Sequence, residues 1–517
     1  MLEMGAFHIT CLVAAYVACV AVLWAITVFS YRLLLHPLRA YPGPLFAKLT
    51  DLYGSYFALS KRLHLITYQN HLKYGRVIRQ GPNKLVFNSV EALHDIYDNE
   101  RVVKSHVYSV TQQAPNVYNL FNVIDRRVHK HKRRLIGQVT GDRSMRIFEP
   151  TMIEQIDVFI DQLSTSSKSS HAVNMTTLLK RLGNDIVSLL AFGYPLNTQV
   201  DLSHRAVEDG AEAANYYAYN RMQFPLWGIR EPKYLLLVLN KGWKTRMEFR
   251  KTLRNMILAR VAKPKDAQHD LYSIVGDAMD SGDAKNLRLG AVWSEAVFFF
   301  PAGSDTTATV LSALFFYLSG NQQSYRKLSH EIRSTFESDE EIRSGPKLAS
   351  CTYLRACIDE SLRISPPVGG TLWREAATSP DNEPLIIDGH VIPPGTQFGV
   401  NMYTIHHNEE YFPDPFAFKP ERWILGEEES KRTRRDAFSP FSIGYRGCAG
   451  KPMAYLEASL VMAKTFWNFD FERAPGKLRE AGAMPERPEQ FQLHDVLTSS
   501  HNGPMLVFRP RKNDGEG

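Results

Sequence analysis

The chain has 517 residues, of which 44% are hydrophobic and 22% charged, a composition typical of a folded globular protein and not of a disordered one. Its net charge of +7 is modest and scattered, which excludes the dense basic stripe of a nucleic-acid-binding protein and fits a basic face for an acidic protein or an anionic membrane. The five cysteines are sparse and odd in number, so they form no disulfide framework, and we expect the main body to face a reducing compartment.

Residues 9–29 form an uncharged, proline-free apolar run that is long enough to cross a membrane. At about 1.5 Å per residue, a helix of this length spans the roughly 30 Å of a hydrocarbon core. A cleaved signal peptide would have a shorter apolar region behind a basic start, but here Glu3 precedes the run while Arg32 and Arg39 follow it. This charge pattern predicts a single-pass anchor, with residues 1–8 in the lumen of the endoplasmic reticulum and the body in the cytosol.

A proline-rich hinge, residues 30–48, follows the anchor, and residues 49–517 form the main domain. The segment HPLRAYPGP within the hinge contains three prolines, which stop any helix and predict a stiff connector. Residues 75–89 then read as two β-rich runs around a Gly-Pro-Asn turn, which predicts a hairpin.

The remaining pattern predicts a fold that is mainly α with small β-sheets (α+β). The expected elements are, in chain order, mostly helices over about 125–337 with looser stretches near 196–204 and 262–290, strands over 385–404, a solvated surface loop at 427–435, a helix from just after Cys448 to about Trp467, and a strand pair over 490–510. Nicotinamide or flavin binding has no support, because no Gly-rich fingerprint follows a strand and opens a helix.

Residues 441–450, FSIGYRGCAG, carry the strongest chemical signal in the sequence. Their five fixed Phe, Gly, Arg, Cys and Gly positions arise by chance in about one chain in ten thousand. The segment resembles the cysteine-ligand loop of the cytochrome P450 family at all five positions, which implies that Cys448 ligates the iron of a haem b. Gly444 and Gly450 would then let the backbone approach the flat macrocycle. A helix that begins after Cys448 would aim its N–H groups at the sulfur and favour the thiolate.

The same resemblance gives roles to two further residues of the loop. Arg446 is placed to meet a haem propionate, and Phe441 is placed to cover the proximal side of the haem. Thiolate ligation pushes electron density toward the iron and favours cleavage of the O–O bond. The loop therefore predicts a haem-thiolate enzyme with a fold of this family, preceded by a transmembrane helix.

Residues 302–307, AGSDTT, lie in a long apolar helix and look like the oxygen-activation motif of the family. The resemblance implies that Asp305 and Thr306 form an acid–alcohol pair that relays protons during the activation of dioxygen, and that Gly303 opens a groove beside the iron. The alternative is a helix with incidental polar residues, whose threonine bonds back to its own turn. We favour the functional reading, because an Asp-Thr-Thr run is costly to bury without a role. Pro301 departs from the family pattern and predicts a kink beside the groove.

Glu360 and Arg363 match the E-x-x-R motif of the family, and residues 420–423, PERW, match its P-E-R motif. The E-x-x-R spacing alone carries no weight, because it recurs elsewhere in the chain. By resemblance, Arg422 completes a buried Glu-Arg-Arg network that holds the fold and the haem loop and does no chemistry. Such a network has to be fully paired to be tolerated in a core.

Three more residues match positions that contact the haem propionates in the family. His129 and Arg133 fit its H-x-x-x-R pattern, and Arg374 occupies the place of another propionate partner. The alternatives are surface charges on a helix for the first two and a solvated strand arginine for the third.

The resemblance implies a monooxygenase that inserts one oxygen atom into an apolar small molecule, of the fungal microsomal type found in secondary-metabolite pathways. Electrons would come from NADPH through an external reductase, with cytochrome b5 as a further candidate partner and no nucleic acid. The expected docking face consists of Lys130, Lys132, Arg133, Arg134, Arg446 and Lys451. Two alternatives stay open, a haem-thiolate isomerase or dehydratase and a non-enzymatic haem sensor, although neither needs a proton relay for dioxygen.

The resemblance to the family also implies that the substrate pocket draws on segments spread along the chain. These segments are residues 102–122, 205–245, 296–306, 366–373 and 493–501. Gly369, Gly370 and Thr371 suggest room beside the haem, whereas Phe298, Phe299 and Leu372 suggest an apolar ligand. Tyr216, Tyr217, Tyr219 and Trp227 are candidates for the entrance, with a place in the core or at the membrane as the alternative.

Overall fold

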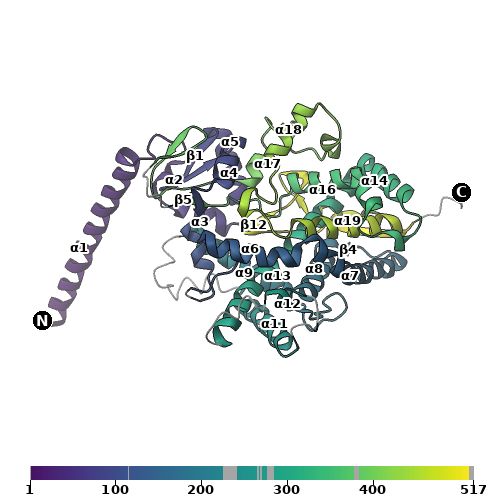
Figure 1. The fold of residues 1–517 in the computed structure, drawn as a ribbon. Coiled ribbons are helices and arrows are strands. Elements are labelled where there is room, and N and C mark those ends of the chain that lie inside the picture. Colours follow the sequence, from purple (N-terminus) through teal and green to yellow (C-terminus); the bar gives the residue numbers. More distant parts are fainter. Residues whose placement is uncertain are drawn as a thin grey trace.

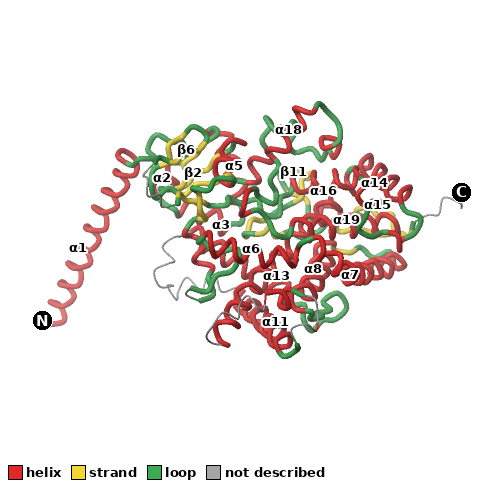
Figure 2. The backbone as a smooth tube through the Cα atoms, in the orientation of Figure 1, coloured by secondary structure: helices red, strands yellow, loops and turns green. Residues whose placement is uncertain are grey.

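The computed structural model of the chain describes residues 2–114, 116–224, 242–264, 267, 270–275, 285–377 and 383–511. Figures 1 and 2 show one long N-terminal helix that leaves a body built mostly of helices, with short strands in small sheets. The predicted mainly α fold with small β-sheets is thereby confirmed. The position of Trp227, together with residues 276–284 of the expected loop at 262–290, lies outside the described residues.

The bounds of the helices and strands are as follows, each kind in chain order. The α-helices are α1 (Leu2–Ser30), α2 (Leu45–Leu49), α3 (Leu52–Leu59), α4 (Leu63–Tyr74), α5 (Val90–Tyr97), α6 (Arg126–Thr140), α7 (Asp142–Ser169), α8 (Met175–Phe192), α9 (Ala206–Gln223), α11 (Trp243–Val261), α12 (Leu271–Val275), α13 (Lys285–Gly320), α14 (Gln322–Thr335), α15 (Pro346–Ser350), α16 (Thr352–Ile364), α17 (Met402–His406), α18 (Glu428–Ala437) and α19 (Lys451–Asn468). The strands are β1 (Val77–Gly81), β2 (Lys84–Phe87), β3 (Val102–Lys104), β4 (Val173–Asn174), β5 (Arg374–Ala376), β6 (Leu385–Ile387), β7 (His390–Ile392), β8 (Gln397–Val400), β9 (Phe469–Arg473), β10 (Ala483–Met484), β11 (Arg487–Phe491), β12 (His494–Val496), β13 (Thr498–Ser500) and β14 (Met505–Pro510). Short 3-10 or π turns are η1 (Tyr31–Leu35), η2 (His106–Thr111), η6 (Asp339–Glu341), η7 (Pro420–Trp423), η8 (Gly444–Arg446) and η9 (Gly476–Glu480).

Helix α1 and the turn η1 contain the predicted anchor. The most apolar 18-residue window within Phe7–Leu35 has a mean hydropathy of 2.5, and none of this window is buried against the body. Figure 1 shows the helix projecting away from the rest of the chain. An isolated helix with apolar side chains on all sides is stable in lipid, not in water, so length and composition are compatible with a membrane span.

The proline-rich connector is held against the body by a buried arginine, Arg79 of β1. Its guanidinium donates to the carbonyl of Arg32 at 2.9 Å and to that of Pro82 at 2.9 Å. Its backbone N–H donates to the carbonyl of Pro42 at 2.7 Å. Gly43 is needed here, because a Cβ at that position would come within 2.4 Å of the Arg79 carbonyl. The connector is therefore docked along β1 and orients the anchor relative to the body.

The largest sheet has the strand order β1-β2-β8-β5-β3. The predicted hairpin at 75–89 is confirmed as the antiparallel pair β1–β2. Strand β8 then lies parallel to β2 and antiparallel to β5, and β5 pairs antiparallel with β3. This order brings Lys104 at the end of β3 directly opposite Arg374 of β5.

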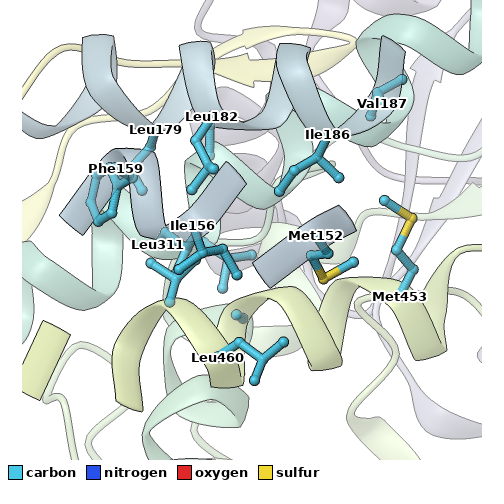
Figure 3. Close-up of a cluster of buried hydrophobic side chains, with 14 of the residues drawn as sticks. Met152, Ile156, Phe159, Leu179, Leu182, Ile186, Val187, Leu311, Met453 and Leu460 are labelled. Carbon is cyan, nitrogen blue, oxygen red and sulfur yellow. The ribbon is translucent and has the colours of Figure 1, made fainter. Parts of the chain in front are cut away.

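The helical core forms where α7, α8, α13 and α19 pack together. Figure 3 shows apolar side chains from these helices meeting, among them Ile156 of α7, Ile186 of α8, Leu311 of α13 and Leu460 of α19. Each of these four side chains is fully or almost fully buried. Helix α13 thus passes through the centre of the body, and its residues can face a cavity only where neighbouring helices leave room.

Two expectations for the C-terminal part are corrected by the structure. The charged run 427–435 lies on the surface as expected, but it is mostly helix α18 and not a loop. Glutamates near its N-terminus and arginines near its C-terminus complement the helix dipole, and Glu428 pairs with Lys431 at 3.1 Å. Residues 490–510 form two separate pairings, since β12 pairs with β13 whereas β14 pairs with β9 and β4. The helix expected after Cys448 is confirmed as α19.

Candidate functional site

The loop between α18 and α19 turns back on itself and presents Cys448 to a cavity. The N–H of Cys448 donates to the carbonyl of Phe441 at 2.8 Å, and the N–H of Gly447 donates to the carbonyl of Gly444 at 3.0 Å. Phe441, Arg446, Cys448 and Gly450 all line the cavity. Cys448 is the one cysteine of the body with an accessible thiol, because Cys351 and Cys357 are buried.

The surroundings of the sulfur act on its ionisation in both directions. Burial raises the pKa of the Cys448 thiol, while the N–H groups of Gly450 and Lys451 and the guanidinium of Arg133 lower it. These N–H groups belong to the start of α19, as expected for a helix that begins just after the cysteine. A cation or metal placed on the sulfur would complete the set of groups that favour the thiolate.

The glycines of the loop have separate purposes. Gly444 does not line the cavity. It has a φ of +69°, and a Cβ there would meet the carbonyl oxygen of Tyr97 at 2.1 Å, so this glycine serves packing against α5. Gly450 does line the cavity, and a Cβ at this position would lie 3.9 Å from the Cys448 Sγ. Of these two, only Gly450 matches the expected close approach to a flat ligand.

The cavity has a volume of about 330 Å³ and is lined mainly by apolar side chains. Its wall includes Phe298, Phe299, Ala302 and Thr306 of α13, with Leu120 and Phe121 across from them. The rings of Phe121 and Phe298 stack with centroids 5.1 Å apart. Apolar walls around a small number of polar groups are typical of a site for a small apolar molecule.

Five cationic or titratable side chains gather on one part of the cavity wall. These are Lys104, His129, Arg133, Arg374 and Arg446. Burial, followed by the positive charges of Arg446, Lys104, Arg133 and Arg374, lowers the pKa of His129 to about 3. Among the described residues none of the four cations forms an ion pair with a carboxylate, so the cluster carries an unbalanced positive charge.

The individual contacts of these cations are to backbone carbonyls. Arg446 donates to the carbonyl of Val123 at 2.6 Å, and Arg374 donates to that of Trp373 at 3.0 Å. Lys104 donates to the carbonyl of Phe121, and burial lowers its pKa well below the ordinary value. Arg133 donates to the carbonyl of Cys448 at 3.3 Å and so braces the cysteine loop.

Lys104 lies in the expected pocket segment 102–122, but the sequence did not single it out as a member of this cluster. Its neighbours in the chain form an ordinary β-strand, and no motif marks it. It joins the site because β3 pairs with β5 and sets Lys104 opposite Arg374, on the same face of the sheet. Its position opposite Arg374 depends on pairing between segments more than two hundred residues apart, which a local sequence pattern does not encode.

The residues present fit a haem b. Several buried cations without carboxylate partners are costly unless an anionic ligand joins them, and the two propionates of haem supply two carboxylates. The thiol of Cys448 opens into the same cavity, and Gly450 lies beside it without a side chain. A group that is apolar over most of its area, with two carboxylates at one edge, matches this distribution of lining residues.

The predicted acid–alcohol pair divides between the cavity and the protein interior. Thr306 lines the cavity, and its Oγ1 donates to the carbonyl of Ala302 at 2.7 Å. Asp305 is buried behind it, where Asn215 Nδ2 donates to its Oδ2 at 3.2 Å. Asn215 also donates to Thr498 Oγ1 at 2.9 Å, and both of these residues line the cavity. Asn215, which the sequence did not single out, therefore links the buried carboxylate to the cavity wall.

Helix α13 remains continuous through Pro301, which itself lines the cavity. The neighbouring Gly303 also lines the cavity, but its lack of a side chain mainly permits helix packing. A Cβ at 303 would come within 2.6 Å of Val187 Cγ2 on α8, and a Cβ at Gly183 would meet the backbone of Ser304 at 3.0 Å. The two glycines thus allow α8 and α13 to pack closely beside the site.

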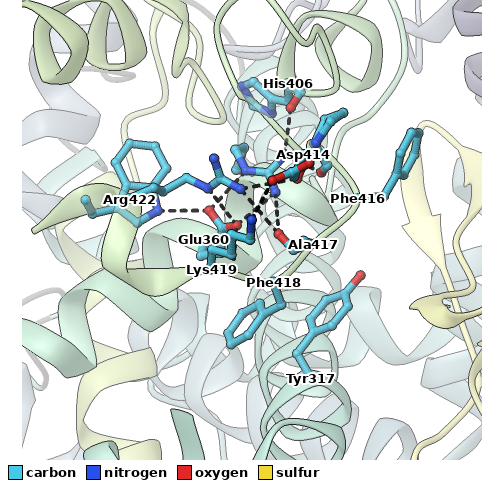
Figure 4. Close-up of polar contacts among 12 residues, drawn as sticks. Tyr317, Glu360, His406, Asp414, Phe416, Ala417, Phe418, Lys419 and Arg422 are labelled. Atoms are coloured by element: carbon cyan, nitrogen blue, oxygen red, sulfur yellow. Dashed lines mark hydrogen bonds and ion pairs between the residues drawn. The ribbon is translucent and has the colours of Figure 1, made fainter. Parts of the chain in front are cut away.

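Glu360, Arg363 and Arg422 form a buried and fully paired network, and Figure 4 shows Arg422 bonded to Glu360 within it. Glu360 accepts from Arg363 at 2.9 and 3.0 Å and from Arg422 at 3.0 Å. Arg363 further donates to the carbonyl of His406 at 2.8 Å, and the ring of His406 accepts from the N–H of Ser439 at 3.1 Å. The network therefore connects α16 to the segment that leads into the cysteine loop.

Several residues expected at the pocket or its entrance lie elsewhere. Gly369 packs near Tyr403, and a Cβ at Gly370 would meet the carboxylate of Asp495 at 3.4 Å, so neither glycine lines the cavity. Tyr219 is buried and donates to Asp495 at 2.6 Å, which makes it a core residue. Further expected positions outside the lining are Thr371, Tyr216 and Tyr217, whereas Leu372, Leu497 and Thr498 are part of it.

The expected docking face also needs a correction. Lys132 forms an ion pair with Glu295 of α13 at 2.7 Å and is largely buried. Arg446 points its guanidinium at carbonyls inside the protein. Lys130, Arg134 and Lys451 are exposed and remain available to a partner.

Known proteins of one family are similar to this chain over most of its length. The sequence profile of the family described as "Cytochrome P450" matches residues 42–493. "Cytochrome P450 monooxygenase poxM" of Penicillium oxalicum is 35% identical over 487 residues, which cover 93% of this chain and 91% of that protein. "Cytochrome P450 monooxygenase AKT7" of Alternaria alternata is 33% identical over 98% of this chain and 99% of its own length. "Cytochrome P450 monooxygenase atnE" of Emericella nidulans is 33% identical over 93% of both chains.

Proposed function

Because the chain belongs to the cytochrome P450 family and is a monooxygenase of that family, we propose that it inserts one atom of dioxygen into an apolar small molecule at a haem b held by Cys448. The observation that carries the proposal is the meeting of an open cysteine thiol, a cluster of carboxylate-free cations and an apolar wall in one cavity. Neither the isomerase or dehydratase reading nor the sensor reading is favoured by any contact in the site.

In this proposal the residues of the cavity would hold the haem. Cys448 would ligate the iron, and Lys104, Arg374 and Arg446 would hold the propionates, with His129 and Arg133 near them. When bound, the haem supplies the iron at which dioxygen is reduced and activated, with the thiolate favouring O–O cleavage. The ring centroids of Phe441 and Tyr455 lie 5.3 Å apart, and we assign to Phe441 the covering of the cysteine side of the haem.

The protein side chains around the cavity position the substrate and deliver protons. Phe298, Phe299 and Phe121 exclude water and favour an apolar ligand. We assign the supply of protons to the buried Asp305 carboxyl and the Thr306 hydroxyl, with Asn215 holding the carboxyl in place. Glu360, Arg363 and Arg422 keep the cysteine loop in position and take no part in the chemistry.

The setting of the reaction is proposed from the N-terminal helix and the relatives. Residues 9–29, within the apolar helix over Phe7–Leu35, anchor the enzyme in the endoplasmic reticulum membrane by one span, with residues 1–8 in the lumen and residues 49–517 in the cytosol. The fungal origin of the relatives supports a role in a secondary-metabolite pathway.

Enzymes of this family receive electrons from a redox partner, and we propose an NADPH-dependent cytochrome P450 reductase, with cytochrome b5 as a second donor. The exposed residues Lys130, Arg134 and Lys451 support a basic docking face on the cysteine side. A neighbouring hollow of about 370 Å³ adds cations to this side, among them Arg434 and Arg435 of α18. An acidic partner surface would be attracted to this charge.

Charge reversal tests the docking face. Lys130→Glu combined with Arg134→Glu should lower turnover with reductase severalfold and leave peroxide-driven turnover unchanged, because peroxide needs no electron donor. Lys73→Glu, at an exposed position on α4, is the matched control. Equal losses in both assays would rule out the docking role of these residues.

The proposed reaction is tested by product mass under labelled dioxygen. The protein is expressed with a fungal reductase in a host that supplies candidate intermediates, and extracts are compared with those of Cys448→Ser and Thr306→Ala. We expect a product heavier by one labelled oxygen atom, absent for Cys448→Ser and reduced for Thr306→Ala. A product of unchanged mass formed without reductase would overturn the monooxygenase reaction, and a product lighter by two hydrogens would change it to a desaturation.

A further inference from the structure

The Asp305 carboxylate faces a polar cluster that extends away from the cavity and joins four elements. Asp305 belongs to α13, Asn215 and Glu212 to α9, Lys180 to α8 and Ser500 to β13. Asp305 is buried and accepts a hydrogen bond from Asn215 at 3.2 Å. Its strongest charged neighbours are Lys180 and Glu212, which have opposite signs.

Glu212 is held in place by three partners. Its Oε2 accepts from Lys180 Nζ at 2.9 Å, and its Oε1 accepts from Ser500 Oγ at 2.5 Å. Lys61 Nζ lies 3.6 Å from the same Oε1 and is partly exposed, so the cluster reaches the surface at this residue. Lys180 is only 12% exposed. Its ammonium group interacts electrostatically with two carboxylates, with Glu212 in direct contact and with Asp305 without direct contact.

We propose that the Lys180–Glu212 ion pair controls the protonation of Asp305, with Lys180 as a positioning residue that favours the carboxylate and Glu212 as its counterweight. The proposal rests on the proposed function, because Asp305 matters here as a supplier of protons to the cavity. Each delivery transfers one proton from the Asp305 carboxyl toward the cavity and takes one proton back from water. Neither Lys180 nor Glu212 needs to contact the substrate or the haem.

The pair keeps its charges, whereas the protonation state of Asp305 can change. Lys180 and Glu212 stay ionised at neutral pH, because the surroundings raise the pKa of Lys180 and lower that of Glu212 to about 2. Burial raises the pKa of Asp305 to about 6, with Lys180 opposing the rise and Glu212 adding to it. A proton donor works best when its pKa lies near the working pH, and the pair keeps Asp305 in that range.

The other titratable groups around this cluster do not take over the control of Asp305 that we assign to Lys180 and Glu212. Next to β13, His501 is buried, its pKa is lowered to about 3, and its ring bonds Thr176 and Thr309, so it stays neutral. One residue further along α8, Arg181 pairs with Glu208 of α9 at 3.1 Å. His494 of β12 lies near Lys61 and Glu212, and burial lowers its pKa.

The two members of the pair should have opposite effects when neutralised. Lys180→Met removes the positive charge and should raise the pKa of Asp305 by about one pH unit. Glu212→Gln removes a negative charge and frees Lys180, so it should lower the pKa of Asp305 by a similar amount. Loss of packing alone would not produce shifts of opposite sign.

The test is an infrared titration of the full-length, haem-loaded protein. The C=O stretch of protonated Asp305 is identified as the band lost in Asp305→Asn, and its pH midpoint is measured in Lys180→Met and Glu212→Gln. Opposite shifts of the midpoint support the proposal, and equal or absent shifts overturn it. Lys180→Arg keeps the charge and should leave the midpoint near that of the unmodified protein, which gives a second reading if Lys180→Met does not fold.

The pH profile of reductase-driven oxygen consumption gives an independent reading. Its alkaline limb, where Asp305 loses the proton it has to supply, should move to higher pH in Lys180→Met and to lower pH in Glu212→Gln, and unmoved limbs in both would count against the proposal. The infrared titration needs neither substrate nor turnover. A failure of oxygen insertion and a failure of this control are therefore separate results.

Discussion

At the scale of single residues, the cavity is defined by charges that lack partners. Lys104, Arg374 and Arg446 contact carbonyl groups but, among the described residues, no carboxylate. A buried cation in this state is costly, and that cost falls when an anionic ligand binds. Each of these cations therefore destabilises the haem-free protein and stabilises the haem-bound protein.

Lys104→Met tests this reasoning. In the haem-free protein the substitution should raise the free energy of unfolding, because it removes a buried cation. In the loaded protein it should accelerate haem loss roughly tenfold or more, since a hydrogen bond to a charged group is worth ~1.5–3 kcal/mol. Chemical unfolding and haem transfer to an acceptor protein measure the two effects. Lys73→Met is the surface control, and slower haem loss from Lys104→Met would contradict the propionate role.

His129 predicts how the haem-free protein responds to acid. Its pKa in the folded state is lowered to about 3 from an ordinary value of 6.5, by burial and by the surrounding cations. The unfolded chain therefore binds more protons between these values, and stability that is fully present above pH 6.5 is lost as the pH falls toward 3. His129→Phe should reduce this loss, measured as the free energy of unfolding against pH. The control is His171→Phe at an exposed loop position, and an unchanged pH dependence of His129→Phe would refute the prediction.

The site residues that the sequence predicted and those that it missed differ in how the chain brings them to the cavity. Cys448, Arg446 and Gly450 follow each other in one loop, so a local pattern was enough to place them at the cavity. Lys104 enters through strand pairing with a distant segment, and Asn215 enters through helix packing, which no local pattern encodes. Gly369 and Gly370 were expected at the cavity because they are small, but neither lines it, and a Cβ at either position would make only ordinary contacts with Tyr403 or Asp495.

At the scale of elements, the site depends on how closely α8 and α13 approach. Gly183 and Gly303 remove side chains on the two facing surfaces, and Val187 fills the space left by Gly303. Extra atoms inserted into such a contact force shifts that cost about 1–3 kcal/mol. The contact also fixes the position of Asp305 and Thr306, which follow Gly303 on the same helix.

Gly303→Ala should therefore destabilise the protein by about 1–3 kcal/mol, because the new methyl group would overlap Val187. The double variant with Val187→Ala should be less destabilised than the sum of the two single variants, as measured by a double-mutant cycle in urea. Gly54→Ala in α3, where a Cβ meets no neighbour within 4 Å, should be neutral or slightly stabilising. Additive effects of Gly303→Ala and Val187→Ala would disprove the close contact.

Element prediction succeeded where local chemistry dominates. The hairpin at 75–89 follows from its Gly-Pro-Asn turn, and α19 follows from the cysteine loop before it. The surface segment 427–435 was taken for a loop because of its charge alone, although its acidic start and basic end favour a helix. The partners of β14 lie far away in the chain, so the pairing with β9 and β4 was beyond a local reading.

At the scale of the whole molecule, the N-terminal helix and the body are distinct in their environments. The helix over Phe7–Leu35 exposes apolar side chains on all sides, whereas the body has a continuous buried core. Arg79 joins the two by holding the connector, starting at Arg32. Every described residue of the site therefore lies in the body, and none lies in the N-terminal helix.

Removal of residues 1–30 should release the body from membranes while its haem spectrum is retained. The reason is that the cut leaves the contacts of Arg79 with the connector intact. Carbonate extraction of membranes, followed by immunoblotting, measures the distribution of the full-length and the shortened protein. If the shortened protein still resists carbonate, a second part of the body inserts into lipid and the single-anchor account is wrong.

The most direct test of the whole account is the absorption spectrum of the reduced protein under carbon monoxide, because this spectrum reports a thiolate on the haem iron. The full-length protein should show the band of a thiolate-ligated haem, and Cys448→Ser should bind haem more weakly and lack that band. Cys357→Ser, which changes a buried cysteine away from the cavity, should keep it. A thiolate band that persists in Cys448→Ser would contradict the assignment of Cys448 and, with it, the site described around it.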